Sequence, residues 1–351
     1  MRAPAAIRLR PVAALLMLGM LSACASTPSV PLVLAPDMER VWPLPPDAAR
    51  VAWLHQVREP ADVGVAEPGR RFFKGLAGKQ TPPRIESPVG LYADEDGWLL
   101  VADTGLQVVH IFNLKAPSYA QAFQLPEGRL ASPVGVTLDR EGGRIFVSDS
   151  IQNRIFLYRT DGYLIGWMGE GLNRVAGLAW DAQRGHLIAA DTGNHRVLVF
   201  DRDGVQIKEI GHRGDQPGEF NFPTHVAVDG AGNIYVSDSL NFRVQVFGPE
   251  GDLQRGVGRA GQTVGSFSKP KGVAVDKNGT LFVVDGIYDV VQMFDASGQV
   301  LMHFGSAGSK PGHFWLPAGI AVAGEDIYVA DTQNQRVQLF RMLPAPLGDG
   351  T

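Results

Sequence analysis

Six short apolar segments, each ending in aspartate, recur along the chain at nearly constant spacing. The steps between successive aspartates are 46, 42, 47, 47 and 46 residues. The aspartates are Asp103, Asp149, Asp191, Asp238, Asp285 and Asp331. A second matching segment lies 14 to 16 residues before each aspartate, as at 88–91 and 133–136, and five of its six copies have glycine at the third position. A self-similar period of this length indicates a repeat protein.

Each repeat divides into short strands separated by turn residues. In the fourth copy, strands are expected at 226–229, 234–237 and 243–247, and a fourth strand follows the Pro-Glu-Gly turn at 249–251. Helical periodicity is absent from the repeats. One such small sheet cannot bury both of its faces, whereas sheets stacked around an axis can. The pattern therefore predicts an all-β fold, a six-bladed β-propeller of four-stranded antiparallel blades.

The sixth repeat ends early, so closing the ring requires a strand from elsewhere in the chain. Blades are expected at about 87–131, 132–173, 174–221, 222–268, 269–315 and 316–341, and the last of these lacks its fourth strand. The strand-like segment 50–57 is predicted to pair into blade 6 as a latch strand. The connector at 58–86 contains a short amphipathic segment at 70–78, which either caps the underside of the ring or touches anionic lipid. Residues 342–351 are a tail.

The first 23 residues are organised like an export signal. Three arginines in the first ten residues precede an uncharged apolar stretch at 12–21, which is short for a membrane span. The Leu-Ser-Ala-Cys that follows resembles the lipobox of bacterial lipoproteins and implies that Cys24 is lipidated, the alternative being a buried thiol behind a conventional signal. By the same resemblance, Ala25 and Ser26 imply an outer-membrane, periplasm-facing location. Six prolines within 24–49 predict a semi-extended tether or a proline-rich ligand segment.

Composition narrows the classes of function. Hydrophobic residues make up 45% of the chain and charged residues 19%, so a filled core is expected and general disorder is excluded. The net charge of −4 argues against a nucleic-acid binder, which normally has a basic face. A single cysteine excludes an intramolecular disulfide and a cysteine-based zinc cluster.

Two segments resemble the NHL repeat. Residues 190–201 (ADTGNHRVLVFD) match its consensus, and residues 328–340 nearly repeat it. The glycine-rich connectors at 211–220, 258–267 and 305–314 also fit, and the resemblance extends over roughly 85–341. Together with the proline-rich stretch at 41–46, it points to bacterial six-bladed NHL lipoproteins. Other members of this superfamily are ubiquitin-ligase scaffolds, RNA binders and a zinc-dependent lyase, but the chain lacks the cysteines of the first and the several channel histidines of the last.

Residues that recur in the repeats are expected to serve the scaffold. In four blades an arginine lies five positions after the aspartate, and each pair is predicted to hold a tight loop. The predicted pairs are Asp149 with Arg154, Asp191 with Arg196, Asp238 with Arg243 and Asp331 with Arg336. Blades 1 and 5 have Val108 and Val290 instead of arginine, so their loops have either acquired another role or drifted.

Five residues in the loops are candidates for binding. His225 replaces the repeat glycine and is expected near the mouth of the central channel, where an imidazole is either packed, a metal ligand or a base. His195, Asp191 and Asp238 are its nearest candidate co-ligands, and zinc would need three or four ligands. Loop-tip positions that vary between repeats predict contact residues, which are Phe242, Tyr288 and Asp289.

Two functions fit these observations. The first is a membrane-tethered, non-enzymatic binding or scaffold module for a protein, peptide or glycan in the bacterial envelope, with no cofactor and no nucleic acid. Its partner is expected to be another envelope protein or peptide. The second is a hydrolase or lyase that depends on zinc or calcium, with His225, Asp191 and Asp238 as ligands at the channel mouth. The sequence contains no nucleophile-elbow, P-loop or haem-attachment motif.

Overall fold

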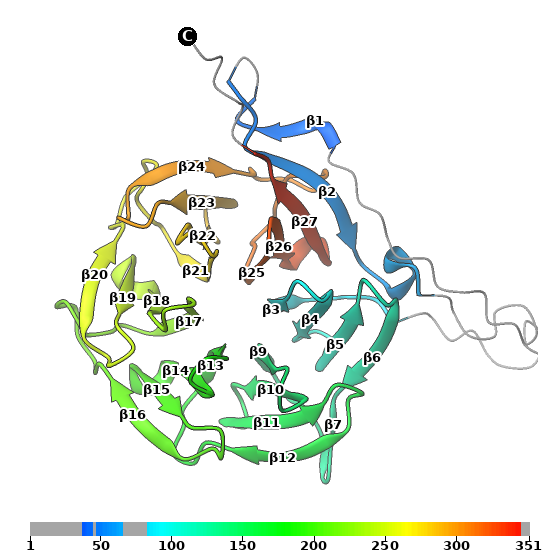
Figure 1. The fold of residues 1–351 in the computed structure, drawn as a ribbon, viewed down its shortest axis with the longest axis vertical. Coiled ribbons are helices and arrows are strands. Elements are labelled where there is room, and N and C mark those ends of the chain that lie inside the picture. The colour runs from blue at the N-terminus through cyan, green and yellow to red at the C-terminus, as the bar shows by residue number, and fades with distance from the viewer. Residues whose placement is uncertain (1–36, 45–46, 66–82, 345–351) are drawn as a thin grey trace, which may run out of the picture.

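The computed structural model describes residues 37–44, 47–65 and 83–344, which form a closed ring of small sheets around a central axis (Figure 1). The predicted signal peptide, Cys24, most of the tether, the amphipathic segment at 70–78 and most of the tail lie outside the described residues. No helix in the described ranges is long and apolar enough to cross a membrane.

Each of the first five blades is an antiparallel sheet of four strands that succeed one another from the axis outward. Blade 1 comprises β3 (Pro88–Ala93), β4 (Trp98–Asp103), β5 (Val108–Asn113) and β6 (Ser118–Ala122). Blade 2 comprises β9 (Pro133–Asp139), β10 (Arg144–Asp149), β11 (Arg154–Arg159) and β12 (Leu164–Met168). Blade 3 comprises β13 (Val175–Asp181), β14 (His186–Asp191), β15 (Arg196–Phe200) and β16 (Gln206–Ile210).

The next two blades repeat this plan. Blade 4 comprises β17 (Pro223–Val228), β18 (Ile234–Asp238), β19 (Arg243–Phe247) and β20 (Leu253–Val257). Blade 5 comprises β21 (Pro270–Val275), β22 (Leu281–Asp285), β23 (Val290–Phe294) and β24 (Val300–Phe304). A small extra hairpin, β7 (Gln124–Leu125) with β8 (Gly128–Arg129), connects blades 1 and 2. The predicted six-bladed, all-β architecture is confirmed.

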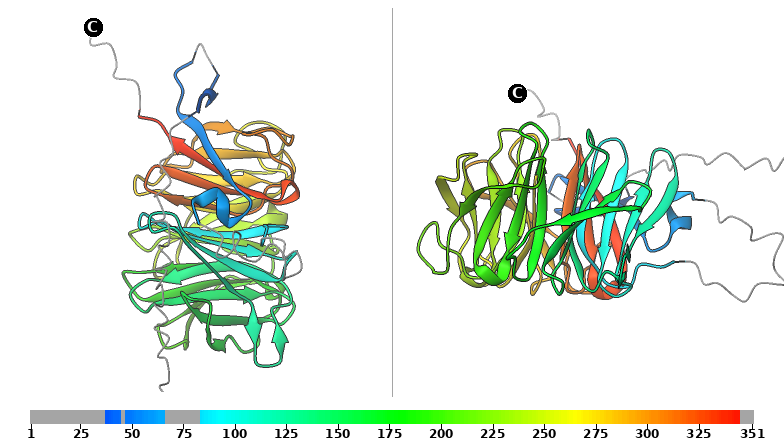
Figure 2. Two further views of the ribbon diagram at one scale, coloured as in Figure 1. Left: turned by 90° about the vertical axis from the view of Figure 1, so that its right-hand side faces the viewer. Right: turned by 90° about the horizontal axis from the view of Figure 1, so that it is seen from below.

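Blade 6 is completed by the N-terminal part of the chain, as predicted. Its own strands are β25 (Ile320–Ala323), β26 (Asp326–Asp331) and β27 (Arg336–Met342). The latch strand β2 (Val51–Val57) pairs antiparallel with β27, and the indole Nε1 of Trp53 donates to Gln338 Oε1 at 3.0 Å. Figure 2 shows β2 and β27 side by side at the edge of the ring. A short 3-10 helix, η1 (Pro60–Val63), follows the latch.

Part of the predicted tether is a strand. Residues 37–42 form β1 (Asp37–Trp42), which pairs with β2 and gives blade 6 a fifth strand. Val41 is buried, and the ring of Trp42 packs against Phe304 and Phe340 at centroid distances of 6.2 and 5.7 Å. Burial of these apolar side chains offsets the low strand propensity of the proline-rich sequence around them.

The core lies between neighbouring blades, and a recurring aromatic pair fills it. The glycine-rich connectors end in Phe220, Phe267 and Phe314, all fully buried. Phe220 packs on Phe247 at 5.5 Å between ring centroids, and Phe267 packs on Phe294 at 5.6 Å. Each connector phenylalanine therefore ties two blades together through apolar burial and tilted ring contacts.

The innermost strands approach one another closely around the axis. A Cβ atom on Gly135 of β9 would collide with the carbonyl of Ala176 on β13, and one on Gly319 would collide with the carbonyl of Val89 on β3. The repeated glycine of the sequence is thus required by backbone proximity between blades.

Candidate functional site

The six repeated aspartates are fully buried and organise the loops on one face of the ring. Asp103 illustrates their role, because it accepts hydrogen bonds from the backbone amides of Glu86 at 2.7 Å and Ser87 at 3.0 Å. It also accepts from the amides of Gly105 and Leu106 within its own loop. A buried carboxylate that is satisfied by several amides is a scaffold element, as the recurrence indicates.

Three of the four predicted aspartate–arginine pairs form. The Nε-to-carboxylate distances are 2.8 Å for Arg196 with Asp191, 2.9 Å for Arg243 with Asp238 and 2.7 Å for Arg336 with Asp331. Arg336 is itself 1% exposed, and its Nη2 donates to the carbonyls of Lys310 and His313.

The fourth pair was predicted wrongly. Arg154 lies over the ring of Trp167, with its guanidinium carbon 3.9 Å from the centroid, and no bond joins it to Asp149. Asp149 instead accepts from the amides of Ala131 and Ser132. Because Arg154 is exposed, stacking on an indole of the neighbouring strand β12 competes successfully with a buried carboxylate.

In blade 1, which has Val108 at the arginine position, a histidine two residues further on bonds the aspartate. His110 is fully buried, its Nε2 lies 3.2 Å from Asp103, and its Nδ1 lies 2.8 Å from the hydroxyl of Tyr119. Burial acts to raise the pKa of Asp103, but hydrogen bonds from His110 and from backbone amides outweigh it and lower that pKa. In blade 5, the bonds that Asp285 accepts within the described part of the chain come from backbone amides, including those of Ser268 and Lys269.

Three of the predicted binding residues occupy one equivalent loop position and join adjacent blades. His195, Phe242 and Asp289 all have a φ of 56°, in the left-handed region that non-glycine residues seldom adopt. The amide of Phe222 donates to His195 Nδ1 at 3.3 Å, and the amide of Leu316 donates to Asp289 at 2.7 Å. The strained backbone of all three residues, and the inter-blade bonds of His195 and Asp289, give these side chains a structural role.

The two aromatic candidates are also partly engaged. The ring of Phe242 packs at the edge of the core between blades 4 and 5. The hydroxyl of Tyr288 donates to the carbonyl of Gly261 at 3.3 Å. Both side chains keep some exposed surface on the loop face.

His225 lies at the channel mouth and is a neutral side chain. The single proton of the Ser239 hydroxyl is donated to the carbonyl of Pro270, so Ser239 can only accept from the Thr224 hydroxyl. The Thr224 hydroxyl has then used its own proton and accepts from His225 Nδ1. His225 Nε2 is closed off from solvent and has no hydrogen-bond partner among the residues that the structure describes. Burial, and secondarily the charge of Lys271, lower the pKa of His225 to about 4.

The predicted metal ligands are not brought together. Within residues 37–44, 47–65 and 83–344, no group of three or more histidine, cysteine, aspartate or glutamate side chains is arranged to hold a metal ion. Asp191 and Asp238 are instead engaged by arginines of their own loops. The metal-dependent alternative therefore has no ligand set among these residues.

A cavity of about 280 Å³, here called the pit, opens at the centre of the loop face. Six of the residues that line the pit form a ring around the axis, one from each blade. Each is the second residue of the repeated segment at which the inner strand of its blade begins, and together they are Val89, Val134, Ala176, Thr224, Lys271 and Ala318. Arg174, Lys269 and Lys271 give its lining a positive charge, and no lining residue is acidic. Sequence reasoning missed this basic pit, although the lysine at one ring position was a visible signal.

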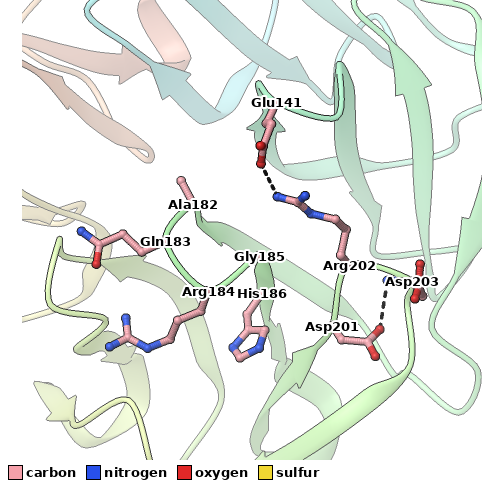
Figure 3. Close-up of a pocket in the computed structure, with 9 residues that line it drawn as sticks. All are labelled: Glu141, Ala182, Gln183, Arg184, Gly185, His186, Asp201, Arg202 and Asp203. Atoms are coloured by element: carbon pink, nitrogen blue, oxygen red, sulfur yellow. Dashed lines mark hydrogen bonds and ion pairs between the residues drawn. The ribbon is translucent and has the colours of Figure 1, made fainter.

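A larger cleft of about 440 Å³ lies on the opposite face, around the turns of blades 2 and 3. Figure 3 shows its charged side chains, among which Arg202 pairs with Glu141 at 2.6 Å and Asp201 accepts from the amide of Asp203. Its lining mixes both signs of charge, and these groups stabilise turns. The pit, which draws on all six blades, is the better candidate site despite its smaller volume.

Comparisons with known proteins agree with the fold. The NHL repeat model matches residues 172–200, 220–247 and 314–340, which lie in blades 3, 4 and 6. No curated protein matches the sequence.

Among solved structures, a protein of unknown function from Bacteroides thetaiotaomicron is 17% identical, with a TM-score of 0.60 and coverage of 76% of this chain and 72% of that one. An auxiliary nutrient binding protein from the same organism is 13% identical, with a TM-score of 0.59 and coverage of 73% and 69%. Virginiamycin B lyase from Staphylococcus aureus is 14% identical, with a TM-score of 0.54 and coverage of 73% and 95%. At such identities the likeness is one of fold. The chain therefore carries NHL repeats within a six-bladed β-propeller.

Proposed function

We propose that this propeller is a non-enzymatic binding module of the bacterial envelope, which uses the loop face around the pit to dock a protein or peptide. The fold is consistent with a binding or scaffold role, and a solved neighbour is described as nutrient binding. One observation carries the choice of face: exposed apolar side chains occupy loop tips that directly follow residues lining the pit, such as Ser150 and Ser239.

These side chains occupy equivalent loop tips. Ile151, Leu240 and Ile287 each lie two residues after a buried aspartate and are 67%, 45% and 52% exposed. Trp315, on the connector into blade 6, is 54% exposed. Apolar side chains gathered on one face mark interaction surfaces, and burying each contributes roughly 1.5–3 kcal/mol.

A lipid on Cys24 would keep the ring close to the membrane. Strand β1 begins at Asp37, so the tether from Cys24 is 13 residues long. Fully extended, 13 residues reach about 45 Å. The proposed location is the periplasmic side of the outer membrane, and the partner is accordingly another envelope protein or peptide.

The test is chemical crosslinking in intact cells of the source bacterium. The triple variant Ile151→Ser, Leu240→Ser, Ile287→Ser should lose the crosslinked adduct of the wild-type protein. The matched control is Ile165→Ser with Ile207→Ser, which removes side chains of similar exposure, 51% and 46%, from the outer strands. Retention of the adduct by the triple variant, or its loss in the control, would assign the binding face elsewhere.

A further inference from the structure

We propose that the pit binds the C-terminal carboxylate of a peptide chain, with Lys271 as its principal ligand. This inference rests on the proposed function, because it identifies the chemical group that the docked partner inserts into the centre of the loop face.

Blade 5 differs from the other blades at one point in the ring. In most blades a hydroxyl follows the buried aspartate, and three of these donate to the proline carbonyl that begins the next blade. The distances are 2.7 Å from Thr192 to Pro223, 2.7 Å from Ser239 to Pro270 and 2.8 Å from Thr332 to Pro88. Blade 5 has Gly286 instead.

The missing side chain makes room for Lys271. A Cβ atom on Gly286 would lie 2.7 Å from Cε and 2.8 Å from Cδ of Lys271, so the lysine stem occupies the space of the absent hydroxyl. The ammonium also takes over the hydroxyl's task, because it donates to the carbonyl of Pro317 at 3.3 Å. This paired exchange places a cation in the ring at a position that is otherwise neutral.

The cation is incompletely satisfied. An ammonium has three donors, and Lys271 uses one of them in a long bond. Burial, followed by repulsion from Lys269, lowers the pKa of Lys271. The nearby carboxylates Asp285 and Asp289 act in the opposite direction, but both accept backbone amides.

Two further cations lie at the rim without counter-charges. Among the described residues, neither Arg174 nor Lys269 has an ion-pair partner, and both are exposed at the pit. Three basic side chains in a lining without acids are complementary to an anion. Hydrogen bonds from such cations to a carboxylate are charge-assisted and therefore stronger than bonds between neutral groups.

The shape of the pit favours the end of a chain. One residue deeper along the inner strands, the space shrinks to about 30 Å³ between strand glycines such as Gly90 and Gly177. In blade 4, His225 replaces this glycine. Its side chain narrows the space below the pit, and because it is neutral it adds no charge there. A peptide that enters the pit end-on has no room to continue through this floor, so its terminus would lie in the pit. Val89 and Val134 supply an apolar wall for the terminal side chain.

The experiment is affinity selection from two synthetic libraries of random N-acetylated hexapeptides, one with free C-termini and one amidated, on purified full-length protein in detergent. Mass spectrometry should show at least tenfold more retention from the free-acid library. Equal retention from both libraries, or none from the free-acid library, would overturn the inference. Preference for internal aspartate or glutamate over a free terminus would also overturn it.

The informative variant is Gly286→Ser with Lys271→Ala, which restores the hydroxyl pattern of the other blades and should leave the melting temperature intact. It should lose retention at least tenfold, and Lys271→Met should behave alike. Lys277→Ala, an exposed lysine on the opposite face, should retain full binding. Unchanged binding by the double variant would overturn the inference. Crosslinking in cells separates this failure from a failure of the proposed function. If the double variant binds peptides normally and keeps its crosslinked adduct, while the triple variant at Ile151, Leu240 and Ile287 loses the adduct, then the proposed function stands and the carboxylate assignment fails.

Discussion

Protonation of His225 is expected to destabilise the folded chain. In the unfolded chain, histidine has a pKa of about 6.5, whereas in the folded protein burial lowers the pKa of His225 to about 4. Between these two pKa values the unfolded state binds more protons than the folded state. The free energy of unfolding therefore falls as the pH decreases from about 6.5 to about 4. Above pH 6.5 the contribution of His225 to that free energy is fully present. Lowering the pKa from about 6.5 to about 4 corresponds to at most about 3–4 kcal/mol of stability.

The assay compares urea unfolding of wild type and His225→Asn at pH 7.5, 6, 5 and 4.5. Asparagine can keep the bond to Thr224 but does not titrate. The difference in unfolding free energy between the two proteins should therefore shift in favour of the variant by roughly 2–3 kcal/mol from pH 7.5 to pH 4.5. A difference that stays constant with pH would refute the assignment of His225 as a closed-off, neutral side chain.

Two further predictions concern the scaffold, both measured by chemical denaturation. Arg336→Ala should lower the free energy of unfolding by about 3–5 kcal/mol, because it leaves Asp331 buried without its guanidinium partner. The control Arg154→Ala, at an exposed site, should lower it by less than ~1 kcal/mol. Similar losses of stability in the two variants would contradict the pairing of Arg336 with Asp331. Gly135→Ala should lower the free energy of unfolding by about 1–3 kcal/mol, because the added Cβ would meet a carbonyl of the next blade. The control Gly166→Ala, where a Cβ would have open space, should change it by no more than ~0.5 kcal/mol. Equal stability of these two variants would contradict close contact between the inner strands.

The repeat spacing determines the blade count, and counting strands in the last repeat leads to the latch at β2. Strand β1 could not be predicted in the same way, because prolines at 43, 45 and 46 dominate its local composition. What holds it is tertiary: Trp42 finds Phe304 and Phe340, which are distant in sequence. Strand propensity read from the local sequence is a weak guide where the burial of an aromatic side chain determines whether a strand forms.

Side-chain partners were predictable only where the repeat kept its pattern. Arg154 obeys the spacing rule but lies beside Trp167, a neighbour that only strand pairing reveals. His110 lies seven residues after Asp103, where blades 4 and 6 have Gln245 and Gln338 bonded to their own aspartates. Aligning the repeats at that position would have identified it.

The pit was similarly visible in principle. Gly286 stands where the other five repeats have serine or threonine, and Lys271 stands where they have valine, alanine or threonine. Either departure alone is compatible with drift. Their significance arises in three dimensions, because the lysine stem fills the space that the glycine vacates.

The loop face around the pit is the proposed binding surface. Its most direct test is photo-crosslinking in intact cells, with a photoreactive amino acid placed either at Ile287 on a loop tip or at Ile207 on an outer strand, positions that are 52% and 46% exposed. We expect a discrete adduct of defined mass from position 287 and none from position 207. No adduct from position 287, or the same adducts from both positions, would contradict it.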